Sequence, residues 1–185
     1  MESKLFTPVT FGPLTLRNRT IRSAAFESMC PGNAPSDMLL DYHRSVAAGG
    51  IGMTTVAYAA VTQSGLSFDR QLWMRPEIIP GLRRLTDAIH AEGAAAGIQL
   101  GHCGNMSHKS ICGCMPVGAS SGFNLYSPTF VRGLRADELP EMARAYGRSV
   151  NLAREAGFDS VEIHAGHGYL ISQFLSPSTN HRKDE

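Results

Sequence analysis

The chain has 185 residues, of which 43% are hydrophobic and 18% charged, and its formal net charge is +1. This composition is typical of a globular domain with a sizeable core, and so small a net charge gives no electrostatic reason to expect a nucleic acid as a partner. No apolar run approaches the roughly 20 residues that span a bilayer, and the N-terminus lacks the apolar core of a signal peptide. We therefore expect a cytoplasmic protein with neither nucleic-acid nor membrane partners.

Strand and helix patterns alternate from the start of the chain. A short hairpin is predicted over Val9–Leu16, and a strand is predicted around Thr20–Ser23. A helix is expected over 36–50, where Ser36 can cap the first turn. The apolar run Ile51–Val61 then predicts a buried strand.

The rest of the chain repeats this unit twice. Helical spacing of apolar residues predicts helices over 77–93 and 135–157, and buried strands are predicted over 95–102 and 158–167. Strands that alternate with helices and are apolar on both faces indicate a parallel sheet. The fold class is therefore α/β, with a hairpin followed by about four strand–helix units.

Polar residues gather where the predicted strands end. Ser23 ends the first strand, Gln99 and His102 end the third, and His164 and His167 end the fourth. Barrels of the (β/α)8 type build their active sites at this face. A doubly wound sheet is the alternative, but it would usually carry a Gly-rich phosphate turn after its first strand, and none is present. The pattern favours a (β/α)8 barrel.

Metal binding is not indicated by the cysteine and histidine spacing. The four cysteines match no zinc or iron–sulfur pattern, and we expect reduced thiols at Cys30, Cys103, Cys112 and Cys114. His164 and His167 could form a metal pair, but no third ligand is apparent. We expect no metal site.

Three stretches carry a resemblance to a known family. They are "KLFTPVTFGPLTLRNR" (4–19), "GIQLGHCG" (97–104) and "GFDSVEIHAGHGYLISQFLSPSTNHRKDE" (157–185). They resemble the old yellow enzyme family of NADH:flavin oxidoreductases. The resemblance implies a (β/α)8 barrel that binds FMN non-covalently. It also implies that NAD(P)H reduces the flavin, which passes hydride to a small electrophilic substrate such as an activated alkene.

The resemblance assigns the polar residues of the fourth strand end to catalysis. His164 and His167 match the pair that hydrogen-bonds the substrate carbonyl oxygen, and Tyr169 matches the proton donor. Hydride addition to an enone leaves negative charge on its oxygen, which two imidazole donors can stabilise. A phenol is neutral at pH 7 and can then protonate the α-carbon.

The resemblance also assigns flavin contacts to the first three strands. Ser23, Ala24 and Ala25 lie where the first strand of the family touches the flavin ring. Ala60 ends the second strand beside the cofactor, and Gln99 matches the glutamine that hydrogen-bonds the flavin pyrimidine.

Two positions depart from the family pattern. Phe26 stands near a position that usually tunes the flavin through a polar side chain, and Asn105 stands where the third-strand motif usually continues to an arginine. The stretch 105–124 that follows is unfamiliar, and we expect a loop there that shapes substrate access.

A full barrel takes about 250 residues, so we expect residues 1–185 to be the N-terminal half of a single FMN-binding barrel domain. An exposed strand edge could make such a half homo-oligomeric. Two alternatives stay open at this point. One is a non-catalytic half-barrel or assembly module that cannot hold FMN by itself. The other is the N-terminal part of a flavoprotein similar to dienoyl-CoA reductase or amine dehydrogenase.

Overall fold

A four-stranded parallel sheet forms the centre of the structure, a computed structural model that describes residues 3–184. Its strands run in the order β3-β4-β5-β9 and comprise Ile21–Arg22, Met53–Ala60, Ala95–Gly101 and Ser160–Ile163. Every neighbouring pair is parallel. The sheet confirms the four predicted strands, although each is shorter than its apolar run.

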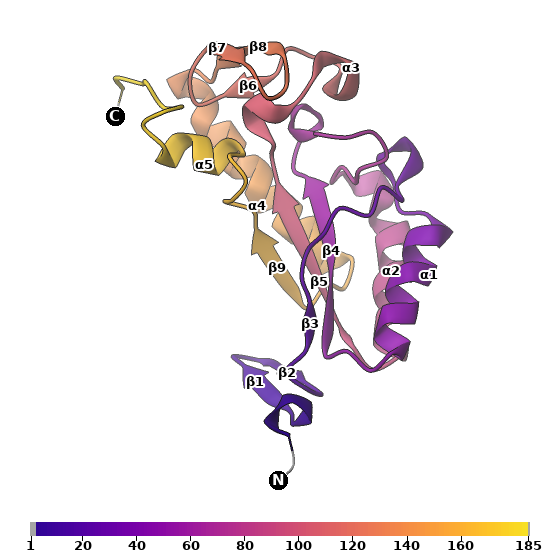
Figure 1. The fold of residues 1–185 in the computed structure, drawn as a ribbon. Helices are drawn as coiled ribbons and strands as arrows, with labels where there is room; N and C mark the ends of the chain where they lie inside the picture. Colours follow the sequence, from indigo (N-terminus) through magenta and orange to yellow (C-terminus); the bar gives the residue numbers. More distant parts are fainter. Residues whose placement is uncertain (1–2, 185) are drawn as a thin grey trace.

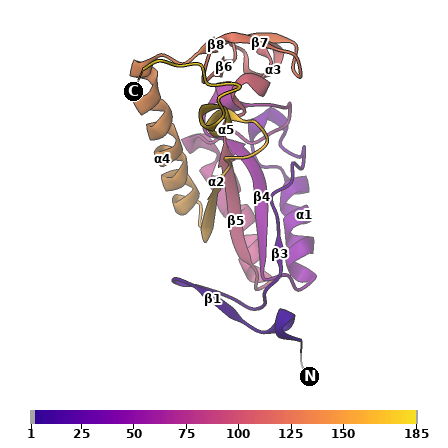
Figure 2. The same ribbon diagram turned by 60° about the vertical axis from the view of Figure 1, so that its left-hand side comes forward.

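Three long helices connect these strands: α1 (Asp37–Ala48), α2 (Ile79–Ala91) and α4 (Leu139–Glu155). The spatial order of the strands is their order in the chain, and right-handed crossovers then place all connecting helices on one face of the sheet. A doubly wound sheet would reverse its strand order at a switch point, so the arrangement is that of a barrel wall (Figures 1 and 2). No helix within residues 3–184 is long and apolar enough to cross a bilayer.

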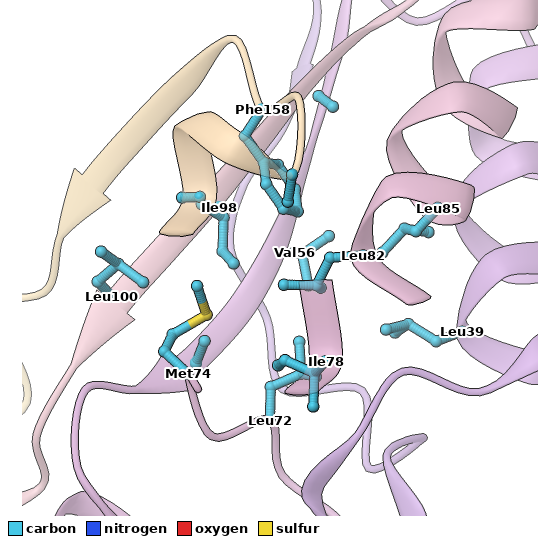
Figure 3. Close-up of a cluster of buried hydrophobic side chains, with 14 of the residues drawn as sticks. Leu39, Val56, Leu72, Met74, Ile78, Leu82, Leu85, Ile98, Leu100 and Phe158 are labelled. Atoms are coloured by element: carbon cyan, nitrogen blue, oxygen red, sulfur yellow. The ribbon is translucent and has the colours of Figure 1, made fainter. Parts of the chain in front are cut away.

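The core lies between the sheet and these helices. Val56 of β4 and Ile98 of β5 face Leu82 of α2, and all three side chains are fully buried (Figure 3). Helix α1 begins as the sequence predicts, because the Ser36 hydroxyl accepts a hydrogen bond from the Leu39 amide. Helices α2 and α4 begin at Ile79 and Leu139, each after a short 3₁₀ turn, and so start later than predicted. Burial of this apolar face is the main source of stability for the wall.

The N-terminal hairpin lies at the amino ends of the strands (Figure 1). It pairs β1 (Val9–Phe11) with β2 (Leu14–Leu16), as predicted. Arg17 follows it and donates to the backbone oxygens of Ala47 at 2.6 Å, Glu92 at 2.7 Å and Ile51 at 2.9 Å. A cation at the carboxyl ends of two helices meets the negative end of each helix dipole, so Arg17 fastens α1 and α2 together.

The stretch expected to be a loop is folded. Residues 105–124 contain α3 (Lys109–Cys112) and the strands β6 (Val117–Gly118) and β7 (Gly122–Asn124). Both strands pair with β8 (Thr129–Gly133), just beyond this stretch, in a second sheet of order β6-β8-β7. This sheet lies at the carboxyl ends of the main strands (Figure 1). A further helix, α5 (Leu170–Leu175), follows β9. Short 3₁₀ turns occupy Lys4–Phe6, Pro31–Asn33, Gln63–Gly65, Pro76–Ile78, Gly104–Met106 and Ala136–Glu138.

Candidate active site

A cavity of about 220 Å³ lies at the carboxyl ends of the main strands. Its lining comes from all four strand ends and comprises Ala24, Ala25, Phe26, Ala57, Tyr58, Phe68, Gln99, His164, His167 and Tyr169. Six of the eight residues assigned from the resemblance therefore meet in one place. A larger hollow of about 460 Å³ lies elsewhere, and one of about 500 Å³ adjoins this cavity at His167. This cavity is the one that gathers histidine, tyrosine and glutamine side chains from separate strands.

The turn after β9 brings the two histidines together. The strand ends at Ile163, and the His164 amide still donates to Leu100 of β5 at 2.8 Å. His167 then adopts a left-handed backbone conformation with φ +56, which is uncommon outside glycine and is found at functional sites. As a result, His164 Nε2 and His167 Nδ1 lie 3.1 Å apart.

Hydrogen bonding assigns the protons on this pair. The Gly166 amide donates to His164 Nδ1 at 3.2 Å, so His164 carries its proton on Nε2 and donates it to His167 Nδ1. His167 then carries its proton on Nε2. Burial, reinforced by the neighbouring His167, lowers the pKa of His164 below its usual value, so its ring is neutral at pH 7. The two rings can supply two N–H donors to one ligand oxygen once the bond between them opens.

Tyr169 stands beside the histidines at the start of α5. Its ring centroid lies 4.9 Å from that of His164 and 5.5 Å from that of Tyr58. Burial raises the pKa of Tyr169, so the phenol keeps its proton at neutral pH. Gln173, fully buried in α5, donates to the backbone oxygens of Gly168 at 2.7 Å and Cys103 at 3.2 Å, which fixes the turn that carries these groups.

Asn105 supports the same turn. Its side-chain oxygen accepts from Gln173 at 2.9 Å, and its backbone oxygen accepts from the side chain of Asn124 in β7 at 2.6 Å. Asn105, which stands in place of the usual arginine, therefore links the second sheet to the turn that follows β9. The sequence alone did not indicate this role, because it depends on contacts between distant segments.

Gln99 pairs with a carboxylate that the sequence analysis missed. Gln99 and Glu162 are in register on β5 and β9, and the Gln99 amide donates to the Glu162 side chain. The alternation of side chains along a strand could have identified Glu162. It stands between the apolar Val161 and Ile163, two residues before His164, and so must face the same side of the sheet as His164. Glu162 leaves the carbonyl oxygen of the Gln99 amide available to a ligand.

The first-strand loop places Ala24 and Ala25 in the cavity and is anchored by Glu27, which the sequence analysis also missed. The buried Glu27 carboxylate lies 3.0 Å from the Arg22 guanidinium and 3.3 Å from His43 Nε2. It also accepts from the Ala57 amide of β4 at 3.3 Å. The preceding Phe26 stacks on Phe68 with ring centroids 4.7 Å apart, so this departure from the family supplies an apolar wall.

Two residues assigned to the cofactor lie outside the cavity lining. Ser23 is the residue after β3, and Ala60 is fully buried. The Ala60 amide donates to Leu72 at 2.8 Å, and its oxygen accepts from Met74 at 2.9 Å, so both backbone groups are already paired. From the same strand, Ala57 and Tyr58 line the cavity instead.

His102 and Cys103 do not form a nucleophile pair. His102 is fully buried, contacts Ser64 through Nε2 at 3.1 Å, and burial lowers its pKa to about 4. Cys103 donates to the backbone oxygen of Leu66 at 3.3 Å, and burial raises its pKa to about 12. Each side chain is therefore held by a contact of the local fold and neither activates the other.

The residues present fit a flat flavin ring. Ala24, Ala25 and Ala57 line the cavity with side chains no larger than a methyl group, which permits close approach of a planar ring. Gln99 offers an amide to the edge of such a ring, and Phe26 offers an apolar face. Within residues 3–184, no group of three or more His, Cys, Asp or Glu residues could hold a metal ion.

Comparison with known proteins decides the family. The model of the NADH:flavin oxidoreductase / NADH oxidase family matches residues 4–185. The chain belongs to this family. Membership in the NADH:flavin oxidoreductase family agrees with the resemblance carried by the third- and fourth-strand motifs.

Two curated family members illustrate the range of relatives. The chain is 43% identical to 4,4'-dithiodibutanoate disulfide reductase of Rhodococcus erythropolis, over 97% of this chain and 45% of that protein. It is 36% identical to NADPH dehydrogenase of Bacillus subtilis, over 100% of this chain and 55% of that protein. The chain thus spans about half the length of the curated relatives it matches.

A solved structure supports the barrel fold. The old yellow enzyme homologue from Zymomonas mobilis superposes with a TM-score of 0.91 at 29% identity, covering 99% of this chain and 54% of that one. Structural neighbours of this kind are (β/α)8 barrels, so this NADH:flavin oxidoreductase family member has the α/β fold of part of such a barrel.

Proposed function

We propose that the protein is an FMN-dependent oxidoreductase that uses NAD(P)H to reduce an activated alkene, such as an enone, or a related electrophile. The observation that supports this most is the single cavity that combines His164, His167 and Tyr169 with the small residues and Gln99 at neighbouring strand ends. When bound, FMN supplies the hydride chemistry, and Ala24, Ala25, Ala57 and Gln99 are the residues that would hold its ring.

The two histidines bind the substrate oxygen in this proposal. The His164 ring is a neutral N–H donor, because burial makes its cation unfavourable at pH 7. Negative charge that develops on a carbonyl oxygen strengthens both hydrogen bonds, and stabilisation of this kind is realised mainly in the transition state. The left-handed turn at His167 holds that ring in place before the substrate arrives.

Tyr169 delivers the proton. Its raised pKa keeps the phenol protonated, and its ring lies against His164 within the same cavity. A proton held beside the bound substrate can be donated to the carbon next to the carbonyl group as the negative charge collapses.

A second candidate function is the reduction of an organic disulfide in the same cavity. It is favoured by the relative named a dithiodibutanoate disulfide reductase, which is more similar to this chain than the NADPH dehydrogenase is, at 43% against 36% identity. Disulfide cleavage requires no proton on carbon, so this candidate gives Tyr169 a smaller role than enone reduction does.

The test is a stopped-flow comparison on the full-length protein. The protein is reduced with NAD(P)H and then mixed with cyclohexenone or with 4,4'-dithiodibutanoate while flavin reoxidation is followed by absorbance. Rapid reoxidation by either electrophile supports the flavin-dependent function and selects the substrate class. Absence of a flavin spectrum after reconstitution with FMN would contradict the proposal.

A further inference from the structure

Cys112 and Cys114 form a close pair of thiols at the end of α3. Their Sγ atoms lie 3.7 Å apart, and the Cys112 thiol also donates to the backbone oxygen of Cys114 at 3.2 Å. A disulfide has an S–S distance of about 2.05 Å, so modest rotation of one side chain would bring the sulfurs within bonding distance. Both are free cysteines in this structure.

The residue between them makes this approach possible. The helix α3 ends at Cys112, and Gly113 reverses the chain with φ +74 while its amide donates to Lys109 at 2.9 Å. Glycine adopts this left-handed conformation without a steric penalty. The turn therefore holds Cys114 next to Cys112, although only one residue separates them.

The two thiols differ in accessibility. Cys112 is 1% exposed and packs in an apolar cluster with Leu66 and Cys103, whereas Cys114 is exposed. An external disulfide can reach Cys114 and cannot reach Cys112 directly. This asymmetry is suited to one attacking thiol and one resolving thiol.

Cys114 opens onto its own cavity of about 460 Å³ between the second sheet and α4. The apolar part of the wall is formed by Met115, Val117, Leu134, Met142 and Ala145. Two ion pairs, Arg132–Glu138 at 2.6 Å and Arg148–Glu141 at 2.7 Å, leave the charged part of the wall balanced. This cavity and the candidate active site share no lining residue. Its chemistry fits a small, uncharged organic disulfide.

We propose that Cys114 and Cys112 form a dithiol site that a small organic disulfide oxidises to an intramolecular disulfide, without participation of the flavin. The Cys114 thiolate attacks one sulfur of the external disulfide, whose S–S bond breaks and releases one thiolate. Cys112 loses its proton to solvent and attacks Cys114 Sγ, which releases the second thiolate. The protein loses two electrons and the external disulfide gains them, so the exchange is balanced.

The charged neighbours of Cys114 set the pH dependence of this exchange. Partial desolvation at the cavity wall and the adjacent Cys112 raise the pKa of Cys114 to about 11, while Arg132 on β8 acts in the opposite direction. Glu138, Glu141 and Arg148 line the same cavity as paired groups. Since the thiolate is the attacking species, the exchange rate should rise about tenfold per pH unit between pH 7 and pH 9.

The test uses 4,4'-dithiodipyridine with the full-length, FMN-loaded protein in the absence of NAD(P)H, so that the flavin supplies no electrons. The wild type should release two more equivalents of thiopyridone per protein than the Cys112→Ala/Cys114→Ala double variant releases. Peptide mass analysis should then show a Cys112–Cys114 disulfide. Cys112→Ala should release one equivalent and retain the thiopyridyl group on Cys114, and Cys114→Ala should match the double variant.

The proposal is overturned if the wild type retains a stable thiopyridyl adduct on Cys114, or if Cys112→Ala still releases two equivalents. Cys112 is buried, so Cys112→Ser provides a second variant of nearly the same size. An unchanged flavin absorption spectrum in each variant shows that the protein has folded. Failure here would leave flavin-dependent reduction untouched, because that activity is measured separately with NAD(P)H.

Discussion

His164 and His167 hydrogen-bond to each other, with 3.1 Å between Nε2 of the first ring and Nδ1 of the second. Any ligand oxygen that takes both imidazole donors must replace this bond. The pair is therefore preassembled, and ligand binding exchanges one hydrogen bond for two.

We predict that His164→Ala and His167→Ala each weaken the binding of a phenolic ligand to the full-length oxidised protein. A phenolate oxygen mimics the charge of an enolate, and one hydrogen bond to a charged group is worth about 1.5–3 kcal/mol, or roughly 10- to 150-fold in affinity. Titration by the long-wavelength charge-transfer absorbance measures the effect. His90→Ala, at the end of α2 beside Asp159, is the control. Unchanged titrations in both site variants would refute the assignment.

Tyr169→Phe should separate the two half-reactions. Flavin reduction by NAD(P)H should stay near the wild-type rate, while reoxidation by a simple enone slows by roughly 10²–10⁴, the usual contribution of a positioned general acid. Stopped-flow absorbance measures both steps. Tyr146→Phe removes a buried hydroxyl outside the cavity and should leave both rates unchanged. Equal slowing of the two steps in Tyr169→Phe would contradict a proton-donor role.

His102 should make stability depend on pH. Its folded-state pKa of about 4 lies below the ordinary value of 6.5, so the unfolded chain binds the proton more readily. The stabilising contribution is complete above pH 6.5 and is lost as pH falls towards 4, by about 3 kcal/mol at most. Urea unfolding of the full-length protein at several pH values measures this slope. His102→Asn should flatten it, and a slope identical to that of the wild type would show that another group is responsible.

Glu162→Ala should weaken FMN binding through Gln99. The carboxylate accepts the Gln99 amide, and its loss frees that amide to rotate away from the orientation available to a ligand. One hydrogen bond of about 0.5–1.5 kcal/mol corresponds to a loss of roughly 2- to 12-fold in affinity. Quenching of FMN fluorescence on binding to the apoprotein measures it. The exposed Glu141→Ala is the control, and an equal loss in both variants would count against the orientation argument.

The sequence predicted the barrel wall well because its strands and helices are marked by patterns of neighbouring residues, such as apolar runs and helix caps. Apolar runs and the cap at Ser36 locate β4, β5 and α1 without reference to distant residues. The fourth-strand motif likewise placed His164, His167 and Tyr169 in one cavity. Where a pattern of hydrophobicity or a specific motif was present, the structure agrees with it.

The remaining features depend on contacts between distant segments. Strands of the second sheet are as short as two residues, as in Val117–Gly118, and carry too few side chains for a periodic pattern. The position of Ala60 outside the lining follows from the bonds of its backbone to Leu72 and Met74, which no property of an alanine can reveal. Glu27 likewise reads as an ordinary loop carboxylate until its contacts with Arg22 and His43 are seen.

The anchoring of the first-strand loop by Glu27 makes that loop a suitable place for protein engineering. The Glu27 carboxylate fixes the loop through its contacts with Ala57 of β4 and His43 of α1. The preceding positions 24–26 can therefore be randomised while these contacts stay intact. Because the histidines and Tyr169 belong to a different strand–helix unit, such a library would vary the proposed flavin surroundings independently of Tyr169, the proposed proton donor. Variants of Phe26 alone would show how far the electron affinity of the flavin can be changed by one side chain.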